Sequence, residues 1–288
     1  MDRYDIAIIG TGPGGISAAI TATIRNKKVV LIGSKDISDK LRKAHRIDNY
    51  PGLPAVTGEQ FAEALIRHLA SLDIKITDKR VSAIYAMGEY YALQADENMI
   101  EATSVILATG VTNGKSLPGE DKYLGRGVSY CATCDARLYA GRPVAVIGYN
   151  EESVKEAEFL SEIVSEVTYY PLTKAAPEER GNLHVLREIP REITGGMKAS
   201  AVVTDQGEHA ADCVFVLRNA VAPDKLVPGL ITEGPHVAVD AMMRTNLPGL
   251  FACGDIVGRP YQYVKAAGQG NIAALSAVDY IDNKKKGI

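Results

Sequence analysis

The stretch "DIAIIGTGPGGISAAITATIRNKKVVLIG", Asp5 to Gly33, decides the fold. The apolar run Ile6–Ile9 enters a glycine-rich turn, a helical pattern follows, and a second apolar run starts at Val29. This order of strand, tight turn, helix and strand is the opening of a doubly wound α/β unit. The turn carries the Gly-x-Gly-x-x-Gly spacing at Gly10, Gly12 and Gly15. These glycines permit the tight turn, the approach of a pyrophosphate to the backbone, and close helix packing. We therefore predict a dinucleotide site here.

The second strand of this unit ends as "VVLIGS", without the acidic residue that usually binds a ribose hydroxyl. Ser34 stands at that position and can replace the carboxylate as a weaker hydrogen-bonding group.

The same pattern occurs a second time in "PVAVIGYNEESVKEAEFLSEIVSEVTYYP", residues 143–171, which superimposes on the first copy without a gap. Nineteen residues separate Gly10 from Val29, and nineteen separate Gly148 from Val167. An internal repeat of this kind predicts two Rossmann-like doubly wound α/β domains in one chain.

Two further strand-like runs end in glycine-containing turns, at Ala108–Gly110 and at Gly254–Asp255. Because strand ends gather at one edge of a doubly wound sheet, they should lie beside the first glycine motif. Such an edge suits a long cofactor such as FAD, with Asp255 accepting hydrogen bonds from its hydroxyls. The order of the segments predicts an FAD-binding domain of residues 1–113 and 245–288, interrupted by an inserted domain of residues 114–244.

The composition narrows the classes of function. A net charge of −3 gives no overall attraction to nucleic acid or to an anionic membrane. Apolar runs such as "SVILATGV" are too short to span a bilayer, and the N-terminus enters a strand at once. We expect a soluble cytoplasmic protein that contacts neither nucleic acid nor membrane.

The chain has four cysteines, and in "CATCD" two residues separate Cys131 from Cys134, with Asp135 directly after them. This spacing is typical of a dithiol that opens and closes a disulfide, with the carboxyl as a proton carrier. Half of a zinc site is the alternative, but Cys213 and Cys253 are far apart and lie in predicted strands. We therefore interpret these two as core cysteines and expect no metal.

The motifs "GTGPGG", "IDNYPG", "ILATGV", "LPGE", "GRGVSYCATCD", "GLFACGDI" and "AAGQGNIAA" together resemble the low-molecular-weight thioredoxin reductases. These are homodimeric FAD enzymes of the pyridine nucleotide-disulfide oxidoreductase type. The resemblance implies that Cys134 faces the flavin, that Cys131 attacks the disulfide of thioredoxin, and that Asp135 is the acid. With the motifs above, the candidate cofactor-binding residues are Gly10, Gly12, Pro13, Gly14, Gly15, Ser34, Asn49, Val81, Thr109, Gly110, Gly254, Asp255, Gln262 and Tyr263.

The second copy departs from the pattern of that family. The family has a glycine motif for NADPH there, but this chain has Asn150 and Ser153 at its glycine and alanine positions and Glu151 and Glu152 between them. Carboxylates in a first helical turn repel a phosphate and satisfy the helix N-terminus themselves. A basic run that holds the 2′-phosphate is replaced by "PLT", residues 171–173. We therefore expect the inserted domain to have lost NADPH binding.

A flavin can instead take single electrons from an iron–sulfur protein, and the chain is similar to the ferredoxin-dependent flavin thioredoxin reductases, which lack NADPH motifs. Ferredoxins are acidic, and a basic run at Lys40, Arg42, Lys43 and Arg46 is a candidate docking surface, with a solvated charge run as the alternative. Tyr261 stands where the family has an arginine, so Tyr261 or Tyr263 can stack on the flavin.

Electron transfer from ferredoxin through FAD and the Cys131–Cys134 dithiol to thioredoxin is thus the predicted function, with rotation of the inserted domain between half-reactions. Three alternatives stay open. They are an NADPH-dependent reductase with a weakened site, a reductase that serves a glutaredoxin-like or peroxiredoxin-like partner, and a flavoprotein sensor without turnover.

Overall fold

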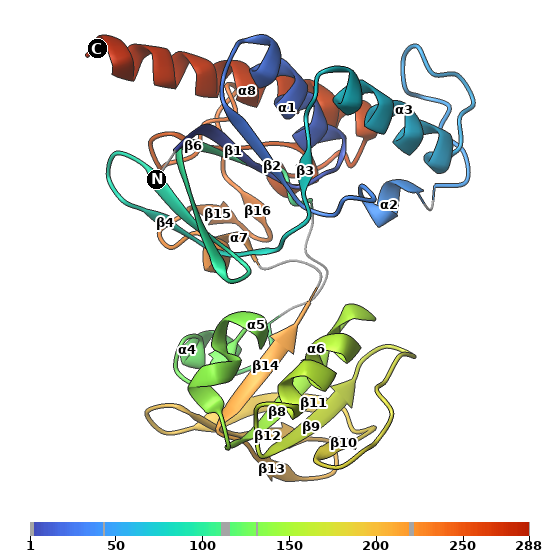
Figure 1. The fold of residues 1–288 in the computed structure, drawn as a ribbon, viewed down its shortest axis with the longest axis vertical. Coiled ribbons are helices and arrows are strands. Elements are labelled where there is room, and N and C mark those ends of the chain that lie inside the picture. The colour runs from blue at the N-terminus through green and yellow to red at the C-terminus, as the bar shows by residue number, and fades with distance from the viewer. Residues whose placement is uncertain (1–2, 43, 111–115, 131, 219–221, 288) are drawn as a thin grey trace. The chain divides into compact units, whose positions relative to one another are not determined.

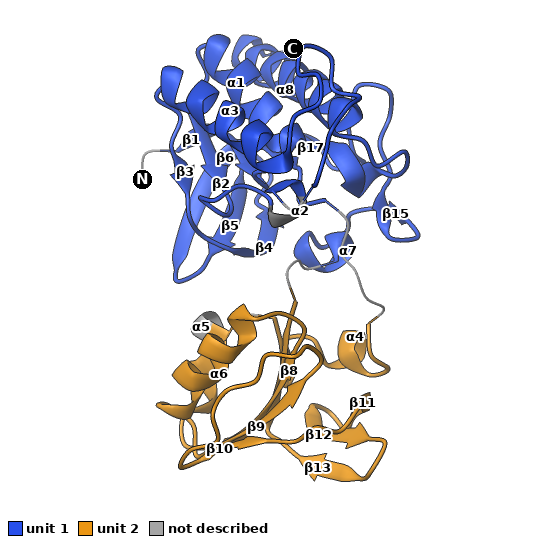
Figure 2. Ribbon diagram, turned by 90° about the vertical axis from the view of Figure 1, so that its right-hand side faces the viewer, with its two compact units in different colours: residues 1–112, 222–288 blue, residues 113–221 orange. Residues whose placement is uncertain are grey.

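The computed structural model describes residues 3–42, 44–110, 116–130, 132–218 and 222–287 (Figure 1). The chain forms two compact units, one of residues 1–112 and 222–288 and the other of residues 113–221 (Figure 2). Each contains its own parallel sheet, as the internal repeat predicts.

The sheet of the first unit is built around β1 (Tyr4–Ile9), which pairs in parallel with β2 (Val29–Ile32) and β6 (Asn98–Leu107). The short strands β3 (Ile76–Thr77) and β17 (Leu250–Ala252) extend it in parallel beside β2 and β6. The strands β4 (Val81–Ala86) and β5 (Tyr91–Ala95) continue from β6 in antiparallel pairing. The parallel part therefore brings the ends of β1, β6 and β17 to one edge.

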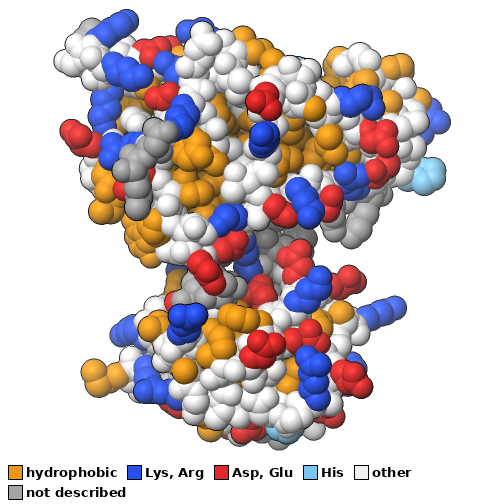
Figure 3. All heavy atoms as spheres, viewed as in Figure 1, with side chains coloured by type: hydrophobic (Ala, Val, Ile, Leu, Met, Phe, Trp, Pro, Cys, Tyr) orange, Lys and Arg blue, Asp and Glu red, His pale blue; other side chains and the backbone are white. Residues whose placement is uncertain are grey.

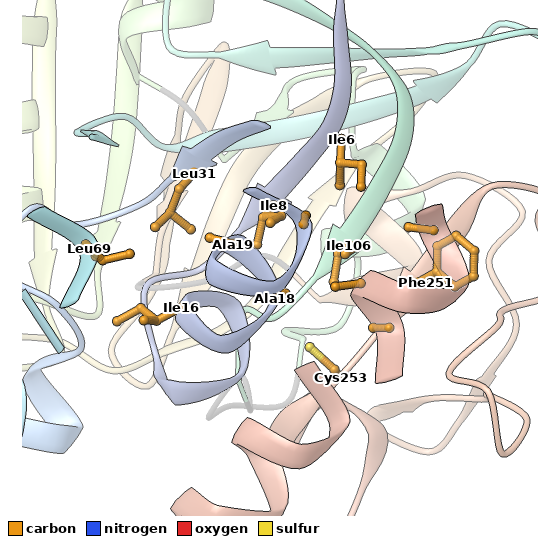
Figure 4. Close-up of a cluster of buried hydrophobic side chains, with 14 of the residues drawn as sticks. Ile6, Ile8, Ile16, Ala18, Ala19, Leu31, Leu69, Ile106, Phe251 and Cys253 are labelled. Atoms are coloured by element: carbon orange, nitrogen blue, oxygen red, sulfur yellow. The ribbon is translucent and has the colours of Figure 1, made fainter. Parts of the chain in front are cut away.

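Helices α1 (Pro13–Ile24), α3 (Gly58–Ser71) and α8 (Tyr263–Lys286) share one hydrophobic core with this sheet. Figure 4 shows Ile16, Ala18 and Ala19 of α1 beside Ile8 and Leu31 of the strands. The small side chains of α1 allow the helix to lie close to the sheet, and α1 begins at Pro13, within the glycine motif. The remaining short helices of this unit are α2 (Asp39–Arg42) and α7 (Pro223–Leu226).

The second unit contains a parallel sheet in the order β10, β9, β8, β14, β7. Its strands are β7 (Val128–Ser129), β8 (Pro143–Gly148), β9 (Glu166–Pro171), β10 (Leu183–Val185) and β14 (Cys213–Leu217). Its helices are α4 (Glu120–Tyr123), α5 (Ala132–Asp135), α6 (Glu152–Ser161) and the 3₁₀ helix η1 (Ala136–Tyr139). An antiparallel sheet of β11 (Pro190–Gly195), β12 (Ala199–Thr204) and β13 (Glu208–Ala210) completes the unit.

The central strands of the second unit are apolar on both faces because each face has its own core. Val144 and Val146 of β8 belong to one hydrophobic cluster, and Ala145 and Ile147 belong to the other. This alternation explains why the run before Gly148 shows no polar position, as is usual for a strand of a parallel sheet that is covered on both sides.

The boundary between the units differs from the predicted one at its second crossing. Residues 222–244, which the sequence assigned to the inserted domain, belong to the first unit. There α7 packs against β4, and a hairpin of β15 (Thr232–Glu233) and β16 (His236–Val237) packs against the 3₁₀ helix η2 (Gly254–Val257). The stretch "RTNLPG" has the composition of a linker, but it is an ordered turn in which the Thr245 hydroxyl donates to the Leu250 carbonyl.

Among the described helices, none combines the length and the apolar character that crossing a membrane requires.

Gly270 of α8 is the point of closest contact between two helices of the first unit. A Cβ at Gly270 would lie 2.0 Å from the carbonyl oxygen of Gly14 in α1. We therefore expect Gly270→Ala to lower the free energy of unfolding by about 1–3 kcal/mol, because the helices must separate.

Gly268→Ala on the same helix is the matched control, since a Cβ there meets nothing within 4 Å. It should raise stability by about 0.5–1 kcal/mol through lower chain entropy. Urea unfolding followed by circular dichroism measures both variants, and equal effects at the two positions would contradict the proposed helix contact.

Candidate functional site

The glycine motif of the first unit forms an open cradle at the start of α1. Gly10 has a φ of +114°, and a Cβ there would lie 2.2 Å from the Ala108 carbonyl oxygen. Gly15 is equally constrained, because its Cβ would lie 1.8 Å from the Gly10 carbonyl oxygen. A Cβ on Gly12, in contrast, would point into open space. The turn is thus closed behind and open in front, as a site for a pyrophosphate requires.

The N-terminus of α1 leaves its backbone N–H groups available to a ligand. Gly12 is the N-cap residue and has no side chain that could accept a hydrogen bond, and the first turn contains no acidic residue. Unsatisfied N–H groups and the positive end of the helix dipole favour an anion at this position.

The predicted convergence of three strand ends is present in the structure. In register, Ile9 pairs with Leu107 and Leu107 with Ala252. Gly10, Ala108 and Cys253 follow these three residues, and the Cys253 N–H donates to the Leu107 carbonyl at 2.9 Å. Thr109, Gly110, Gly254 and Asp255 come next in the chain at the same edge. The candidate residues of three separate motifs therefore surround one edge of the sheet.

The Gly254–Asp255 turn is held by two side chains of α8 that the sequence reasoning missed. Gln269 Oε1 accepts the Gly254 N–H at 3.0 Å, and Lys265 Nζ donates to the carbonyl oxygens of Gly254 and Gly258 at 2.8 and 2.7 Å. Burial lowers the pKa of Lys265, while the charge of Asp255 opposes this effect. Lys265 and Gln269 are four residues apart on one helix, and this spacing could have indicated that both side chains lie on the same face, toward the turn.

The other candidate residues of this unit lie in two places. Asn49 Nδ2 donates to Gln262 Oε1 at 2.5 Å, which joins the "DNYPG" loop to the residue before α8. The Tyr263 ring lies 6.1 Å from that of Phe61, measured between centroids. Val81, in contrast, begins β4 and is buried, outside the three strands whose ends form the cradle. The proximity of Asn49 to Gln262 is thus a contact that the motifs alone did not indicate.

Two further polar candidates are engaged within the protein. Ser34 is exposed, and its hydroxyl oxygen accepts the Asp36 N–H at 3.3 Å, while its carbonyl accepts the Thr11 hydroxyl at 3.0 Å. The Tyr261 hydroxyl is hydrogen-bonded to His236 Nε2 at 2.7 Å. This bond fixes the Tyr261 ring beside the β15–β16 hairpin.

In the second unit, protein groups fill the position that corresponds to the open cradle. Asn150 Oδ1 accepts the Ser153 N–H at 2.8 Å, and the Ser153 hydroxyl donates to the Asn150 carbonyl at 2.5 Å. The Tyr169 hydroxyl lies 2.7 Å from the Ser153 hydroxyl. A Cβ at Gly148 would lie 2.1 Å from that Tyr169 oxygen. Asn150 stands at the position of Gly12 in the repeat, so its side chain occupies the front of the turn, while Ser153 and Tyr169 are buried behind it.

The residue that caps α6 is not one of the two glutamates that the sequence predicts. Glu151 is the N-cap residue but makes no capping hydrogen bond, and both Glu151 and Glu152 are exposed. The Asn150 side chain accepts the N–H of Ser153 in the first turn of α6 instead. A short asparagine side chain readily accepts an N–H two or three residues ahead at a helix start. The glutamates add only negative charge.

The loop after β9 contains no cation between residues 171 and 173. The Leu172 N–H donates to the Gly148 carbonyl at 2.9 Å, which closes this loop over the end of β8. Lys174 is exposed, and Arg180 lies 3.8 Å from Glu158. Residues 171–173 therefore offer no cation to a 2′-phosphate, and the two cations that follow are an exposed lysine and an arginine paired with Glu158.

The dithiol segment connects β7 to α5 in the second unit. Cys131 lies outside the described residues, as does the side chain of Cys134, whose backbone belongs to α5. Ala132 N–H donates to Glu156 Oε2 of α6 at 3.3 Å. Asp135 is half-buried beside this short helix. The geometry of the dithiol itself thus stays a prediction.

The two remaining cysteines are buried and free, Cys213 in β14 and Cys253 directly after β17. Burial raises the pKa of each thiol to about 12. Figure 4 shows Cys253 within the core of the first unit. These thiols stay protonated at neutral pH and have the character of core residues.

The candidate docking run has acidic partners where the structure describes it. Arg42 donates to the Glu59 carboxylate and to the Asp36 carbonyl, and Arg46 Nε lies 2.8 Å from Asp48. Lys43 and the side chain of Lys40 lie outside the described residues. Basic and acidic side chains are likewise mixed over the face that Figure 3 shows. The positive potential of this run is therefore smaller than its sequence indicates.

Comparisons with known proteins agree with this geometry. The family model for pyridine nucleotide-disulphide oxidoreductases matches residues 4–270. The thioredoxin reductase of Treponema pallidum is 30% identical over 299 residues, which cover 97% of each protein. Among solved structures, a ferredoxin-flavin thioredoxin reductase from Clostridium acetobutylicum is 50% identical with a TM-score of 0.93, covering 99% of this chain and 100% of that one.

A thioredoxin reductase from Gloeobacter violaceus is also similar, with 30% identity and a TM-score of 0.80 over 98% of this chain and 95% of that one. The family match spans both units and both copies of the strand–turn–helix repeat. The chain therefore belongs to the pyridine nucleotide-disulphide oxidoreductase family and is a homologue of the thioredoxin reductases.

Proposed function

We propose that this protein is a flavoprotein disulfide reductase that takes electrons from reduced ferredoxin and delivers them to thioredoxin through the Cys131–Cys134 dithiol. One observation carries the proposal: the cradle of the first unit is open at Gly12, whereas the Asn150 side chain occupies the equivalent position of the second unit and caps its helix. A chain with one open dinucleotide cradle has a place for FAD but none for NADPH. The similarity to the ferredoxin-flavin thioredoxin reductase supports the same donor.

The residues of the first unit fit FAD. The backbone N–H groups at the start of α1 would bind the pyrophosphate, and Asp255 would accept hydrogen bonds from hydroxyls of the cofactor. Lys265 and Gln269 hold the turn that presents Asp255. When bound, FAD supplies a group that accepts single electrons and gives up a pair.

The protein residues then carry out thiol–disulfide exchange. The Cys131 thiolate attacks a sulfur of the thioredoxin disulfide and forms a mixed disulfide, and a thiolate leaves on thioredoxin. The Cys134 thiolate next attacks Cys131, which releases reduced thioredoxin and leaves the Cys131–Cys134 disulfide. Two electrons and two protons regenerate the dithiol, and Asp135 is the proposed carrier of one proton.

The partner surface and the assembly belong to the same proposal. Ferredoxin would bind the run Lys40–Arg46, where the described ion pairs are exposed and therefore weak enough to be exchanged for acidic groups of a partner. Two copies would form a homodimer, as in the reductases that the chain resembles. The cytoplasm, which holds reduced ferredoxin and keeps thiols reduced, is the proposed compartment.

The electron donor is the first test. Under anaerobic conditions, reduced ferredoxin should bleach the visible absorbance of the flavin, whereas NADPH at micromolar concentration should not. Two lost charge-assisted contacts, at about 1.5–3 kcal/mol each, weaken NADPH binding by more than about a hundredfold. Stopped-flow absorbance measures both rates, and rapid bleaching by NADPH with none by ferredoxin would overturn the donor assignment.

The filled cradle gives a second prediction. The Asn150 side chain stands where Gly12 leaves open space in the first unit, so Asn150→Gly with Ser153→Ala should open the front of the turn. NADPH binding should then tighten by about tenfold or more, equivalent to about 1.4 kcal/mol. Adding Tyr169→Leu should bring no further gain, because Tyr169 belongs to the core that α6 shares with the sheet. Calorimetric titration compares the variants, and a gain that appears only in the triple variant would show that Tyr169, and not Asn150, closes the site.

The two cysteine roles predict different trapped complexes. Cys134→Ser retains the attacking thiol and removes the resolving one, so it should accumulate a mixed disulfide between Cys131 and thioredoxin. Cys131→Ser should accumulate much less of it. Non-reducing electrophoresis with mass spectrometry identifies the bridge, and preferential trapping through Cys134 would reverse the proposed roles.

A further inference from the structure

A partly buried polar cluster lies where three neighbouring strands of the second unit end. Tyr149 follows β8, Arg218 follows β14, and Tyr130 follows β7, and these strands are adjacent in the sheet. Because the strands are parallel, all three residues leave the sheet at the same edge. The fourth member, Glu120, is the first residue of α4. We call these four residues the edge cluster.

Glu120 is the centre of the edge cluster. Its side chain is fully buried, and that of Arg218 is 12% exposed. Arg218 donates to both carboxylate oxygens, with a distance of 2.9 Å from Nη2 to Oε2. The Tyr130 hydroxyl donates to Oε1 at 2.9 Å, and the Leu117 N–H donates to Oε2 at 2.8 Å. Every described contact of this carboxylate is therefore a donor.

Tyr149 completes the surroundings of the guanidinium. Arg218 Nη2 donates to the Tyr149 hydroxyl at 3.1 Å, and the guanidinium carbon lies 4.3 Å from the centroid of that ring. Burial and the negative charge of Glu120 raise the pKa of Tyr130, which keeps this hydroxyl protonated and able to donate. The direction of the hydrogen bond from Tyr130 to Glu120 is thereby fixed.

An ion pair of this kind needs an explanation other than stability. Removing two charges from water costs about as much as their attraction returns, so apolar side chains of similar volume stabilise a core equally well. What a buried, fully bonded carboxylate adds is a defined position for its partners. The partner that matters is Tyr130, because the next residue in the chain is Cys131.

The chain is also held on the other side of Cys131. The Ala132 N–H donates to Glu156 of α6 at 3.3 Å. Cys131 is therefore flanked by one residue whose side chain is bonded to Glu120 and one whose backbone is bonded to Glu156. Both bonds end on a carboxylate, but the bond from Tyr130 is the shorter one, at 2.9 Å, and its acceptor Glu120 is fully buried.

We propose that Glu120 and Arg218, acting through the Tyr130 hydroxyl, position the dithiol segment and thereby set the stability of the Cys131–Cys134 disulfide. This inference rests on the proposed function, in which these two cysteines cycle between dithiol and disulfide. Glu120, Arg218 and Tyr130 are positioning residues, since none of them exchanges electrons or protons with the reacting sulfurs.

The sign of the effect follows from geometry. A disulfide forms only when two Cα atoms lie about 4.4–6.8 Å apart with suitable side-chain directions. Because Tyr130 is covalently joined to Cys131, its hydrogen bond to Glu120 limits the backbone conformations open to the dithiol state. Opening the disulfide then gains less conformational entropy, which favours the disulfide over the dithiol. Loss of the hydroxyl releases this constraint, so the disulfide should become easier to reduce.

Tyr130→Phe is the variant that tests the proposal, because it removes one hydroxyl while Glu120 keeps its bonds to Arg218 and Leu117. We expect the equilibrium constant for disulfide formation to fall about tenfold, which corresponds to a rise in potential of about 30 mV. The full-length flavoprotein is equilibrated in buffers of oxidised and reduced dithiothreitol, quenched, denatured and alkylated. Mass spectrometry then counts four alkylated cysteines in the reduced form and two in the oxidised form.

Tyr123→Phe is the matched control. Tyr123 is a buried tyrosine of the same unit whose hydroxyl donates to the Gly195 carbonyl and accepts from Lys122 Nζ. Its described hydrogen bonds do not reach Tyr130 or Ala132, the neighbours of Cys131. This variant should lose stability without a change in potential. Glu120→Gln, which keeps an acceptor for Tyr130 but removes the charge, should shift the potential in the same direction by a smaller amount.

The outcomes separate the proposal from the function on which it rests. A wild-type potential in Tyr130→Phe, with a loss of stability like that of Tyr123→Phe, would reduce the edge cluster to a structural role. A wild-type protein that never changes between four and two alkylated cysteines would instead refute the dithiol itself. A shift in Tyr130→Phe without one in Tyr123→Phe supports the proposal.

Discussion

An α-helix begins with backbone N–H groups that have no partner inside the helix, and the two units of this chain satisfy that constraint differently. In the first unit, α1 follows Gly12, which has no side chain to offer, so the N–H groups face open space. In the second unit, Asn150 accepts the N–H of Ser153, and the Ser153 hydroxyl meets that of Tyr169 in the core behind the turn. The same strand–turn–helix geometry thus forms a ligand site in one unit and a closed structural element in the other.

The open and closed turns explain why the second unit can keep its fold after losing a ligand. A dinucleotide would accept hydrogen bonds from the helix N-terminus and fill the space beside Gly148. Without a dinucleotide, the N–H groups would lack acceptors and the space would be empty. Asn150, Ser153 and Tyr169 replace these contacts with internal hydrogen bonds among buried groups. Buried polar groups without hydrogen-bond partners cost free energy, which explains why several residues of the turn differ together from the open cradle.

Much of the fold could be predicted from the sequence because the repeat, the apolar runs and the glycine spacing are local patterns. The convergence of Gly10, Ala108 and Gly254 followed from the rule that parallel strand ends share an edge. The second domain boundary could not be predicted, because an ordered turn and a linker share the same residue types.

The cap of α6 was assigned to its glutamates and not to Asn150, since either residue type suits that position. Contacts across long separations in sequence, such as Tyr169 over Gly148 or Arg218 with Glu120, leave no periodic signal at all.

The retained sheet of the second unit has a use that does not depend on a nucleotide. A protein donor binds from outside and needs no cradle, but a dithiol that alternates between two partners needs a rigid support. The parallel sheet supplies this support because its strand ends place Tyr130, Tyr149 and Arg218 around one buried carboxylate. Ligands of doubly wound sheets bind at the carboxyl ends of the strands, and in this unit polar side chains that bond to one another stand there. Two separate sets of protein groups thus stand at this edge: Asn150 closes the turn after β8, and Glu120, paired with Arg218, binds the residue that precedes the dithiol.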